Sequence, residues 1–207
     1  MSINTTNKDI ALYNRIKKGD RIAFNTIFDK YYGSLCDFSY MMNGNKELAE
    51  EVVADVMANI WIKKNKIEIV HSLKAYLFRS TRNMTISYMR KRKLNTVHIE
   101  DSIHFQPIES SNPEEKIIQE ESLIYVENIL NIIPEKSRRI FKMHRFDKLK
   151  YQEISNILEI SNKTVEKHMS KAIKIMREYK ATHLLIVLLS FTIIIKIVFL
   201  FQKGIFL

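Results

Sequence analysis

The sequence is poor in turn-forming residues and in cysteine. It has 4 Gly and 3 Pro in 207 residues, so the two together make up about 3% of the chain against an average of roughly 12%. Sandwiches and barrels need many tight turns, which argues against an all-β fold. The single cysteine, Cys36, excludes an intramolecular disulfide and any site built from several cysteine ligands.

Motifs for catalysis and cofactor binding are also missing. The six histidines show neither an i,i+4 pair nor the HExxH spacing that holds a metal on one helix face. There is no Gly-rich phosphate loop and no GxSxG segment. We therefore expect a protein that is not an enzyme, with no catalytic residue, metal or cofactor. The polar N-terminus does not have the pattern of a secretory signal, which favours a cytoplasmic protein.

Charge is abundant and strongly segregated. The net charge is +10, which favours a polyanionic partner, either nucleic acid or an anionic membrane face. Residues 72–97 contain seven basic residues and no acid, residues 100–127 contain eight acids and one base, and residues 135–180 contain thirteen bases and six acids. The acidic stretch also holds Pro107 and Pro113, so we expect a linker at 95–117. The prediction is an all-α fold, with helical domains at 10–94 and 118–180 and a hydrophobic C-terminal helix at 184–201.

Apolar residues in the first domain recur at helical spacing. One helix is predicted around 24–42, with an apolar stripe of Phe24, Ile27, Phe28, Tyr31, Leu35, Phe38 and Met42. Asn43-Gly44-Asn45 interrupts the pattern. A second helix is then predicted at 46–64, with a stripe of Leu48, Val52, Val56 and Ile60.

A third helix is predicted from its cap, Ser72, to about residue 93, after a loop at 63–71. The expected buried stripe is Leu73, Tyr76, Leu77, Met84 and Tyr88. A separate face carries Arg79, Arg82, Asn83 and Arg90. Solvated faces usually mix both signs of charge, so a face without acids favours contact with phosphates. Tyr76 or Phe78 would stack on an exposed base if either points outward, although both also suit the core.

The second domain contains a helix-turn-helix pattern at 151–178. Pro134 predicts a helix start, Ile140, Phe141 and Met143 follow as buried residues, and Ile154, Leu158, Val165 and Met169 are expected to point inward. Glu159 stands where the motif usually has a glycine in left-handed backbone, at a cost of about 1 kcal/mol. Ser161 is the expected cap of the second helix. Its outer side, predicted to contact DNA, carries Asn162, Lys163, Thr164, Lys167, His168 and Lys171. Two amphipathic helices without DNA contact are the alternative.

The segments AEEVVADVMANIW at 49–61, SLKAYLFRSTRNMTISYMRKRK at 72–93 and the unit 134–178 together resemble extracytoplasmic-function (ECF) sigma factors. The resemblance implies core RNA polymerase and promoter DNA as partners, and an anti-sigma factor is a further candidate. By this resemblance, the helix with Glu50, Asp55 and Met57 docks on the clamp coiled coil of polymerase. Ala54 and Met57 depart from the Gln and Phe common in the family, and a core role for Met57 is an equal alternative.

The same resemblance implies roles for the remaining segments. The face with Arg79, Arg82, Asn83 and Arg90 would melt the promoter, the loop at 63–71 would hold a flipped base, and 134–178 would read the minus-thirty-five element. In the resembled family the linker threads toward the polymerase active site. An anionic linker can mimic RNA, and the eight acids of 100–127 fit that role, with a merely solvated linker as the equal alternative.

The last feature is the apolar tail from Leu184 to Phe201, whose only charge is Lys196. As a helix it would span about 27 Å, close to the hydrocarbon thickness of a bilayer. Three interpretations stay open: a tail anchor that keeps 1–183 cytoplasmic, a helix packed on the protein itself, and a binding segment for a membrane regulator. The predicted function is a sigma factor. A membrane-tethered helix-turn-helix regulator would leave 72–93 unexplained, and a nucleic-acid enzyme would need catalytic groups that the sequence lacks.

Overall fold

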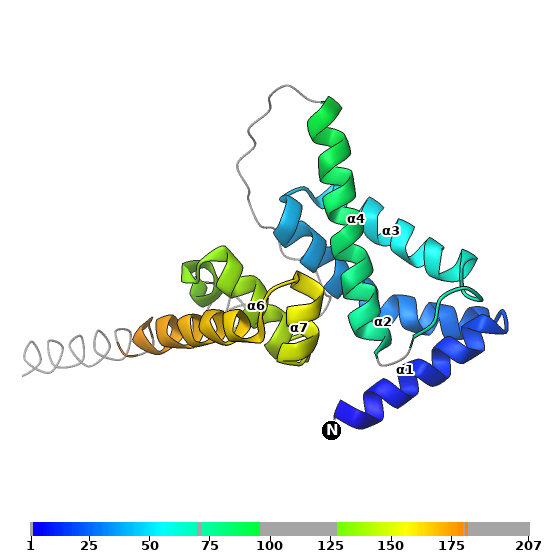
Figure 1. Ribbon diagram of the computed structural model, residues 1–207, viewed down its shortest axis with the longest axis horizontal. Helices are drawn as coiled ribbons and strands as arrows, with labels where there is room; N and C mark the ends of the chain where they lie inside the picture. Colours follow the sequence, from blue (N-terminus) through cyan, green and yellow to red (C-terminus); the bar gives the residue numbers. More distant parts are fainter. Residues whose placement is uncertain (1, 70–71, 96–127, 180, 182–207) are drawn as a thin grey trace, which may run out of the picture. The chain divides into compact units, whose positions relative to one another are not determined.

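The computed structural model describes residues 2–69, 72–95, 128–179 and 181, and all regular structure within these ranges is helical (Figure 1). This confirms the all-α prediction. The described residues form two compact units, one of 2–69, 72–95 and 139–166 and the other of 128–138 with 167–179 and 181. The predicted tail helix at 184–201 and nearly all of the predicted linker, residues 96–117, lie outside the described residues, as do residues 70 and 71 of the loop.

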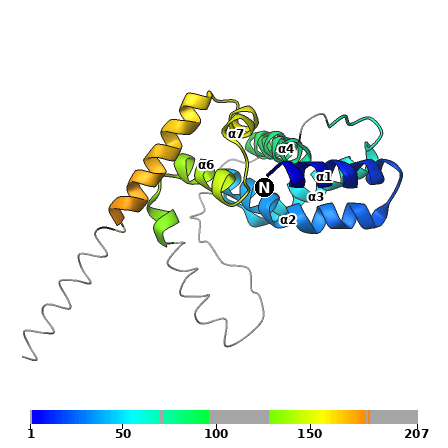
Figure 2. The same cartoon turned by 90° about the horizontal axis from the view of Figure 1, so that it is seen from below.

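The first unit opens with a helix that the sequence analysis did not predict, α1 (Ser2–Lys17). It lies beside α2 (Arg21–Asn43), as Figure 2 shows. Asp9 of α1 is 2% exposed and accepts hydrogen bonds from the Lys30 ammonium and the Tyr31 hydroxyl of α2. A buried carboxylate needs such partners, so this polar cluster fixes α1 against α2.

The ends of α2, α3 (Lys46–Ile62) and α4 (Leu73–Asn95) follow from side-chain caps. The Asp20 carboxylate accepts from the Ala23 amide at 3.0 Å, and the Asn45 side chain accepts from the Leu48 amide at 2.6 Å. Between α2 and α3, Gly44 has φ 69°, a left-handed conformation that favours glycine. The Ser72 hydroxyl accepts from the Ala75 amide at 3.1 Å, which confirms the predicted cap of α4.

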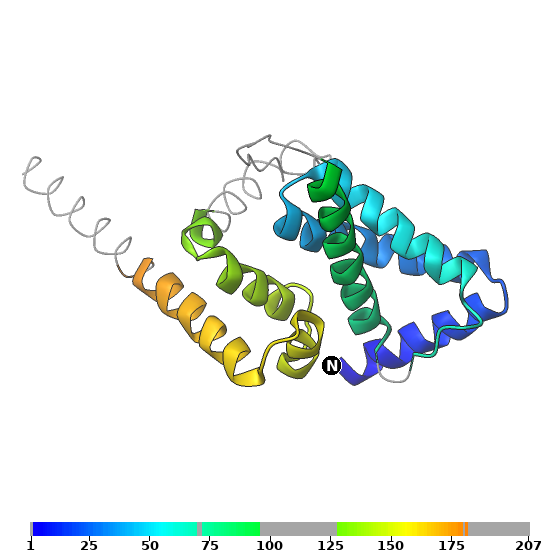
Figure 3. The same ribbon diagram turned by 45° about the horizontal axis from the view of Figure 1, so that its top comes forward.

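The core of this unit lies where α2, α3 and α4 pack on one another (Figure 3). The predicted stripe of α3 is buried throughout, whereas α4 differs from its prediction. Phe78, Thr81 and Thr85 are buried, and Tyr76, Met84 and Tyr88 are only half-buried. The Phe78 ring packs at a tilt against the Phe38 ring of α2, with ring centroids 5.2 Å apart. The Thr85 hydroxyl forms a 2.8 Å hydrogen bond with Ser39 of α2, so burial of these two hydroxyls is compensated, whereas the buried Thr81 hydroxyl has no hydrogen-bond partner among the described residues.

The helix-turn-helix segment consists of α6 (Glu135–Arg145), α7 (Tyr151–Leu158) and a helix at 162–179. The Pro134 carbonyl accepts from the Arg138 amide at 2.9 Å, so the proline lies one position before its predicted place. The predicted inward residues are buried except Leu158, which is half-buried while Ile157 takes the inward position.

Candidate nucleic-acid and polymerase interfaces

The cationic face of α4 is present, although one of its residues is not free. Arg79, Asn83 and Arg90 are exposed. Arg82 is different: its side chain is 16% exposed, and its guanidinium is 2.9 Å from the Glu159 carboxylate. The same guanidinium donates to the Asn83 side chain at 3.3 Å. Of the four predicted residues, therefore, Arg79, Asn83 and Arg90 present their donors to solvent in this conformation.

The two aromatic residues considered for base stacking, Tyr76 and Phe78, differ in their exposure to solvent. Phe78 has no exposed surface and belongs to the core, so its outward orientation was a wrong alternative. Tyr76 is half-buried. Phe78 is therefore not part of the exposed cationic face, whereas Tyr76 lies three residues before Arg79 on the same side of α4 and stays a candidate.

The loop after α3 is anchored at its base by α1. Two backbone hydrogen bonds, from the Lys66 and Ile67 amides to the Lys63 carbonyl, close its first turn at 2.8 and 3.1 Å. The Tyr13 hydroxyl of α1 donates to the carbonyls of Lys64 at 3.0 Å and Ile67 at 3.2 Å. Sequence reasoning missed this contact, because it assigned no helix to 2–17. The step of three from Ile10 to Tyr13 and again to Ile16 is the signal that was available.

The three predicted polymerase contacts of α3 have different environments. Glu50 is exposed, whereas Met57 is 1% exposed and lies in the core, which favours the packing alternative for that residue. Asp55 is half-buried and accepts a hydrogen bond from the Tyr88 hydroxyl of α4. That hydrogen bond is the largest cause of the rise in the pKa of Tyr88 to about 12. Asp55 thus joins α3 to α4, whatever else it contacts.

The turn of the helix-turn-helix has the predicted left-handed residue. Glu159 has φ 56° and ψ 46°, and its amide donates to the Ser155 carbonyl. The Ser161 hydroxyl then accepts from the Thr164 amide at 3.1 Å, which confirms the predicted cap of the helix at 162–179. The tight turn and the cap together set where the second helix begins.

The outer side of that helix presents most of the predicted donors. Lys163, Lys167 and Lys171 are exposed. The Asn162 amide is exposed but donates to the Gln152 side chain at 2.6 Å, and the Thr164 hydroxyl lies 2.8 Å from that of Ser161.

His168 has a structural partner within its own unit. Its Nδ1 lies 2.9 Å from the Ser137 hydroxyl, and the residue is half-buried. Burial, followed by the charges of Lys136, Lys167 and Lys171, holds the pKa of His168 below its usual value. A neutral imidazole that bonds to Ser137 is a packing group, so His168 is less available to DNA than the exposed lysines beside it.

Within the described ranges, no group of three or more His, Cys, Asp or Glu side chains could hold a metal ion. Cys36 has an unreactive environment, because burial raises the pKa of its thiol to about 11. The chemistry available at these surfaces is binding through cations, amides and hydroxyls.

Models of known families match both the segment that contains α4 and the segment that contains the helix-turn-helix. The family model for Sigma-70 region 2 matches residues 27–94, and the model for Sigma-70, region 4 matches 123–176, together more than half of the chain. The ECF RNA polymerase sigma factor SigW of Bacillus subtilis is 24% identical over 79% of this chain and 92% of its own length. SigM of the same organism is 27% identical over 68% of this chain and 84% of its own.

The chain belongs to the ECF sigma factors of the sigma-70 family. It is therefore a sigma factor that directs transcription initiation, which confirms the predicted function. The cationic α4 lies in region 2 and the helix-turn-helix in region 4, whereas α1 precedes both matched segments.

Solved structures share the fold of this sigma factor. CnrH in complex with the cytosolic domain of CnrY has a TM-score of 0.54 at 17% identity, covering 84% of this chain and 97% of that one. The sigma factor RpoE of Bartonella quintana, bound to the anti-sigma factor NepR, has a TM-score of 0.53 at 22% identity, covering 75% and 94%.

The membrane prediction concerned residues 184–201, which follow both matched family segments. Among the described helices, none combines the length and the apolar character needed to cross a bilayer. The tail at 184–201 is outside that set, so its membrane contact stays a prediction.

Proposed function

We propose that this sigma factor acts through two separate DNA contacts, by binding alone and without chemistry of its own. As part of this proposal the functional domains are taken from the sequence, 10–94 and 118–180, while the compact units of the structure divide the chain differently. The exposed side of the helix at 162–179, with Lys163, Lys167 and Lys171, binds the upstream promoter element. The α4 face with Arg79, Asn83 and Arg90 holds the strand that separates during melting. The observation that carries this proposal is the set of exposed donors on α4, a helix without a single acid.

Phosphate contact explains the α4 face better than solvation does. Arginine and asparagine side chains donate hydrogen bonds to phosphate oxygens and to base edges. A solvated helix has no requirement to exclude acids, and α4 has none over 23 residues. Arg82 adds to the face only when its ion pair with Glu159 opens, so we assign it a secondary role.

The polymerase contact centres on Glu50, which is exposed on α3, rather than on the buried Met57. Asp55 is a less suitable residue to test, because it accepts a hydrogen bond from Tyr88 of α4 and its replacement would also disturb the packing of α3 on α4. Glu50→Lys is therefore the cleaner test: reversing an exposed charge should weaken retention of the chain on core polymerase and leave the circular dichroism spectrum unchanged. Asp29→Lys, at an exposed position of α2, is the matched control. Equal retention of both variants would remove Glu50 from the interface.

A further part of the proposal is control by an anti-sigma factor in the bacterial cytoplasm. One structural relative, RpoE of Bartonella quintana, is bound to the anti-sigma factor NepR, and another, CnrH, is bound to the cytosolic domain of CnrY. We also propose that the apolar segment 184–201 governs where the protein is located or when it is available, since the proposed DNA contacts all precede it. A chain ending at Tyr179 should then start transcription at the same site as the full chain, and a changed start site would contradict this assignment.

The melting role is tested by strand opening. In holoenzyme with the double variant Arg79→Ala and Asn83→Ala, closed-complex affinity should remain close to wild type while permanganate reactivity of the promoter falls. Arg21→Ala removes an exposed arginine from α2 and is the control. Normal reactivity in the double variant would show that the α4 face is only solvated.

A further inference from the structure

The loop at 63–69 is held at two points, and both involve backbone carbonyls. At its beginning, the Lys64 ammonium folds back over the Trp61 ring, 4.2 Å from the centroid, and donates to the Trp61 carbonyl at 3.3 Å. Further on, the Tyr13 hydroxyl reaches the carbonyls of Lys64 and Ile67. The loop thus owes its shape to a residue more than fifty positions earlier in the chain.

Tyr13 is well suited to hold backbone in place. It is 2% exposed, and burial raises the pKa of its phenol to about 12, so it remains a neutral donor at physiological pH. Its ring also lies under a cation, the ammonium of Lys17, at 5.5 Å. A buried donor aimed at two carbonyls of one turn restricts the backbone there to a narrow range of conformations.

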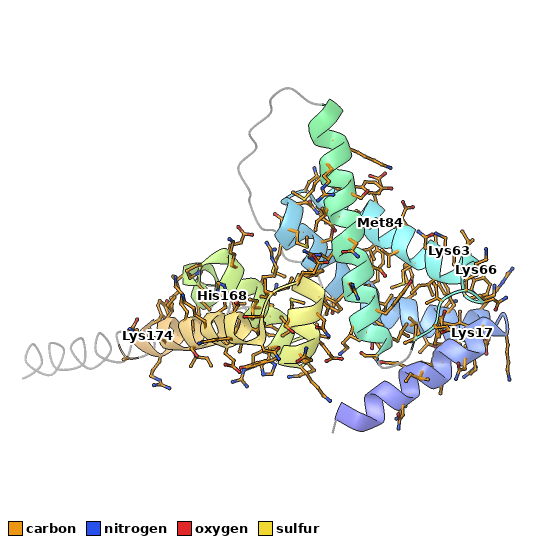
Figure 4. The ribbon with its side chains drawn as sticks, in the orientation of Figure 1. Lys17, Lys63, Lys66, Met84, His168 and Lys174 are labelled. Carbon is orange, nitrogen blue, oxygen red and sulfur yellow. The ribbon has the colours of Figure 1, made fainter. Side chains whose placement is uncertain are left out.

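The rim of this anchored loop is cationic and open to solvent. Lys63, Asn65 and Lys66 are exposed, and Lys17 is half-buried at the end of α1. Figure 4 shows Lys17, Lys63 and Lys66 near the same end of the first unit. The combination is a fixed backbone, an amide and several ammonium groups, which suits a single-stranded nucleic acid better than a protein helix.

We infer that Tyr13 is a positioning residue, which sets the loop at 63–69 in the conformation that discriminates one unpaired promoter base. This rests on the proposed function, in which the neighbouring α4 holds the melted strand. Reading a base edge requires donors and acceptors held to within a fraction of an ångström. A loop that sampled many conformations would bind phosphates as strongly as the anchored loop does. It would discriminate less between one base and another. α1 therefore contributes to promoter choice through Tyr13, although Tyr13 itself touches no DNA.

The experiment compares base preference in holoenzymes made from core polymerase and full-length chain. The probe is a fork-junction DNA library in which a fixed upstream duplex, selected with the wild-type holoenzyme, precedes unpaired non-template positions of random sequence. Bound molecules are sequenced. Tyr13→Phe removes only the hydroxyl, and Tyr88→Phe is the control, because it deletes the hydroxyl that bonds to Asp55 on another part of the unit.

Tyr13→Phe should lower the preference at one unpaired position by about 2- to 10-fold, the range expected for one neutral hydrogen bond. Preference at the upstream element should not change, and Tyr88→Phe should retain the wild-type profile at saturating polymerase. Hydrogen exchange at the amides of the loop should become faster in Tyr13→Phe alone. That second readout separates a local loss of anchoring from a general loss of stability.

Two negative outcomes are distinguishable. If the wild-type holoenzyme shows base preference and Tyr13→Phe retains all of it, Tyr13 does not position the loop and the inference is wrong, while the proposed function stands. If the wild-type holoenzyme shows no preference at any unpaired position, the loop reads no base. The inference then fails, whereas the proposed strand contact of α4 requires no base preference and is tested separately by permanganate reactivity.

Discussion

Replacing Glu159 with glycine tests whether the turn of the helix-turn-helix stores backbone strain. Glu159 has φ 56°, a conformation that costs an L-residue about 1–2 kcal/mol and costs glycine little. Glycine also gives the unfolded chain more freedom, which opposes the gain by about 0.4–1 kcal/mol. The carboxylate in addition pairs with Arg82, but with 58% of its side chain exposed the pair is worth only about 0–1 kcal/mol.

The variant Glu159→Gln separates these effects, because it removes the ion pair and keeps the strain. We expect Glu159→Gly to be more stable than Glu159→Gln by about 0.5–1 kcal/mol, the difference between relief of strain and added freedom of the unfolded chain. Urea unfolding of the full chain measures this difference.

The control is Asn156→Gly, at an exposed position inside α7, where glycine should cost about 0.3 kcal/mol relative to asparagine and should give no gain in stability. A glycine variant at 159 that is less stable than the glutamine variant would refute the reasoning. Such a result would mean that the left-handed conformation carries no strain in this turn.

Three further predictions concern the second domain and its surroundings. Ser161→Ala should lower the free energy of unfolding by about 1 kcal/mol through loss of the helix cap, whereas Ser170→Ala, exposed in the same helix, should have little effect; equal losses would contradict the cap. Burial raises the pKa of Asp147 to about 6 from 3.8, so the folded chain binds more protons between these values and its stability falls as pH rises through that window. Asp147→Asn should flatten this slope, and an unchanged slope would argue against burial of the carboxyl. Lys167→Ala should reduce the salt dependence of promoter binding by about one counterion if it contacts a phosphate, while a loss confined to one base position would identify a base contact instead.

Much of the fold could be predicted because capping residues and apolar spacing act locally. Ser72, Gly44 and Ser161 each impose a helix boundary through atoms within a few residues, and all three boundaries are as expected. The left-handed Glu159 is likewise a property of the turn itself.

The parts that could not be predicted depend on contacts distant in the sequence. α1 is polar and has a weak apolar stripe, and its place depends on Asp9, whose partners are twenty-one and twenty-two residues away. Helical spacing assigned Tyr88 to the core and Arg82 to the open cationic face, but Tyr88 bonds to Asp55 of α3 and Arg82 pairs with Glu159 of the turn after α7. Periodicity shows which residues share a face, and it does not show which partner covers that face.

Run-off transcription tests the central claim most directly. Core RNA polymerase, the full chain and a DNA fragment selected by their mixture should yield a transcript with one start site, and omission of either protein should abolish it. The variant with Arg79→Ala and Asn83→Ala should bind the fragment and yield far less transcript, whereas Arg21→Ala should behave as wild type. Sequence-specific DNA binding by the chain alone, with no specific transcript when core polymerase is added, would contradict the account and favour a regulator that acts without polymerase.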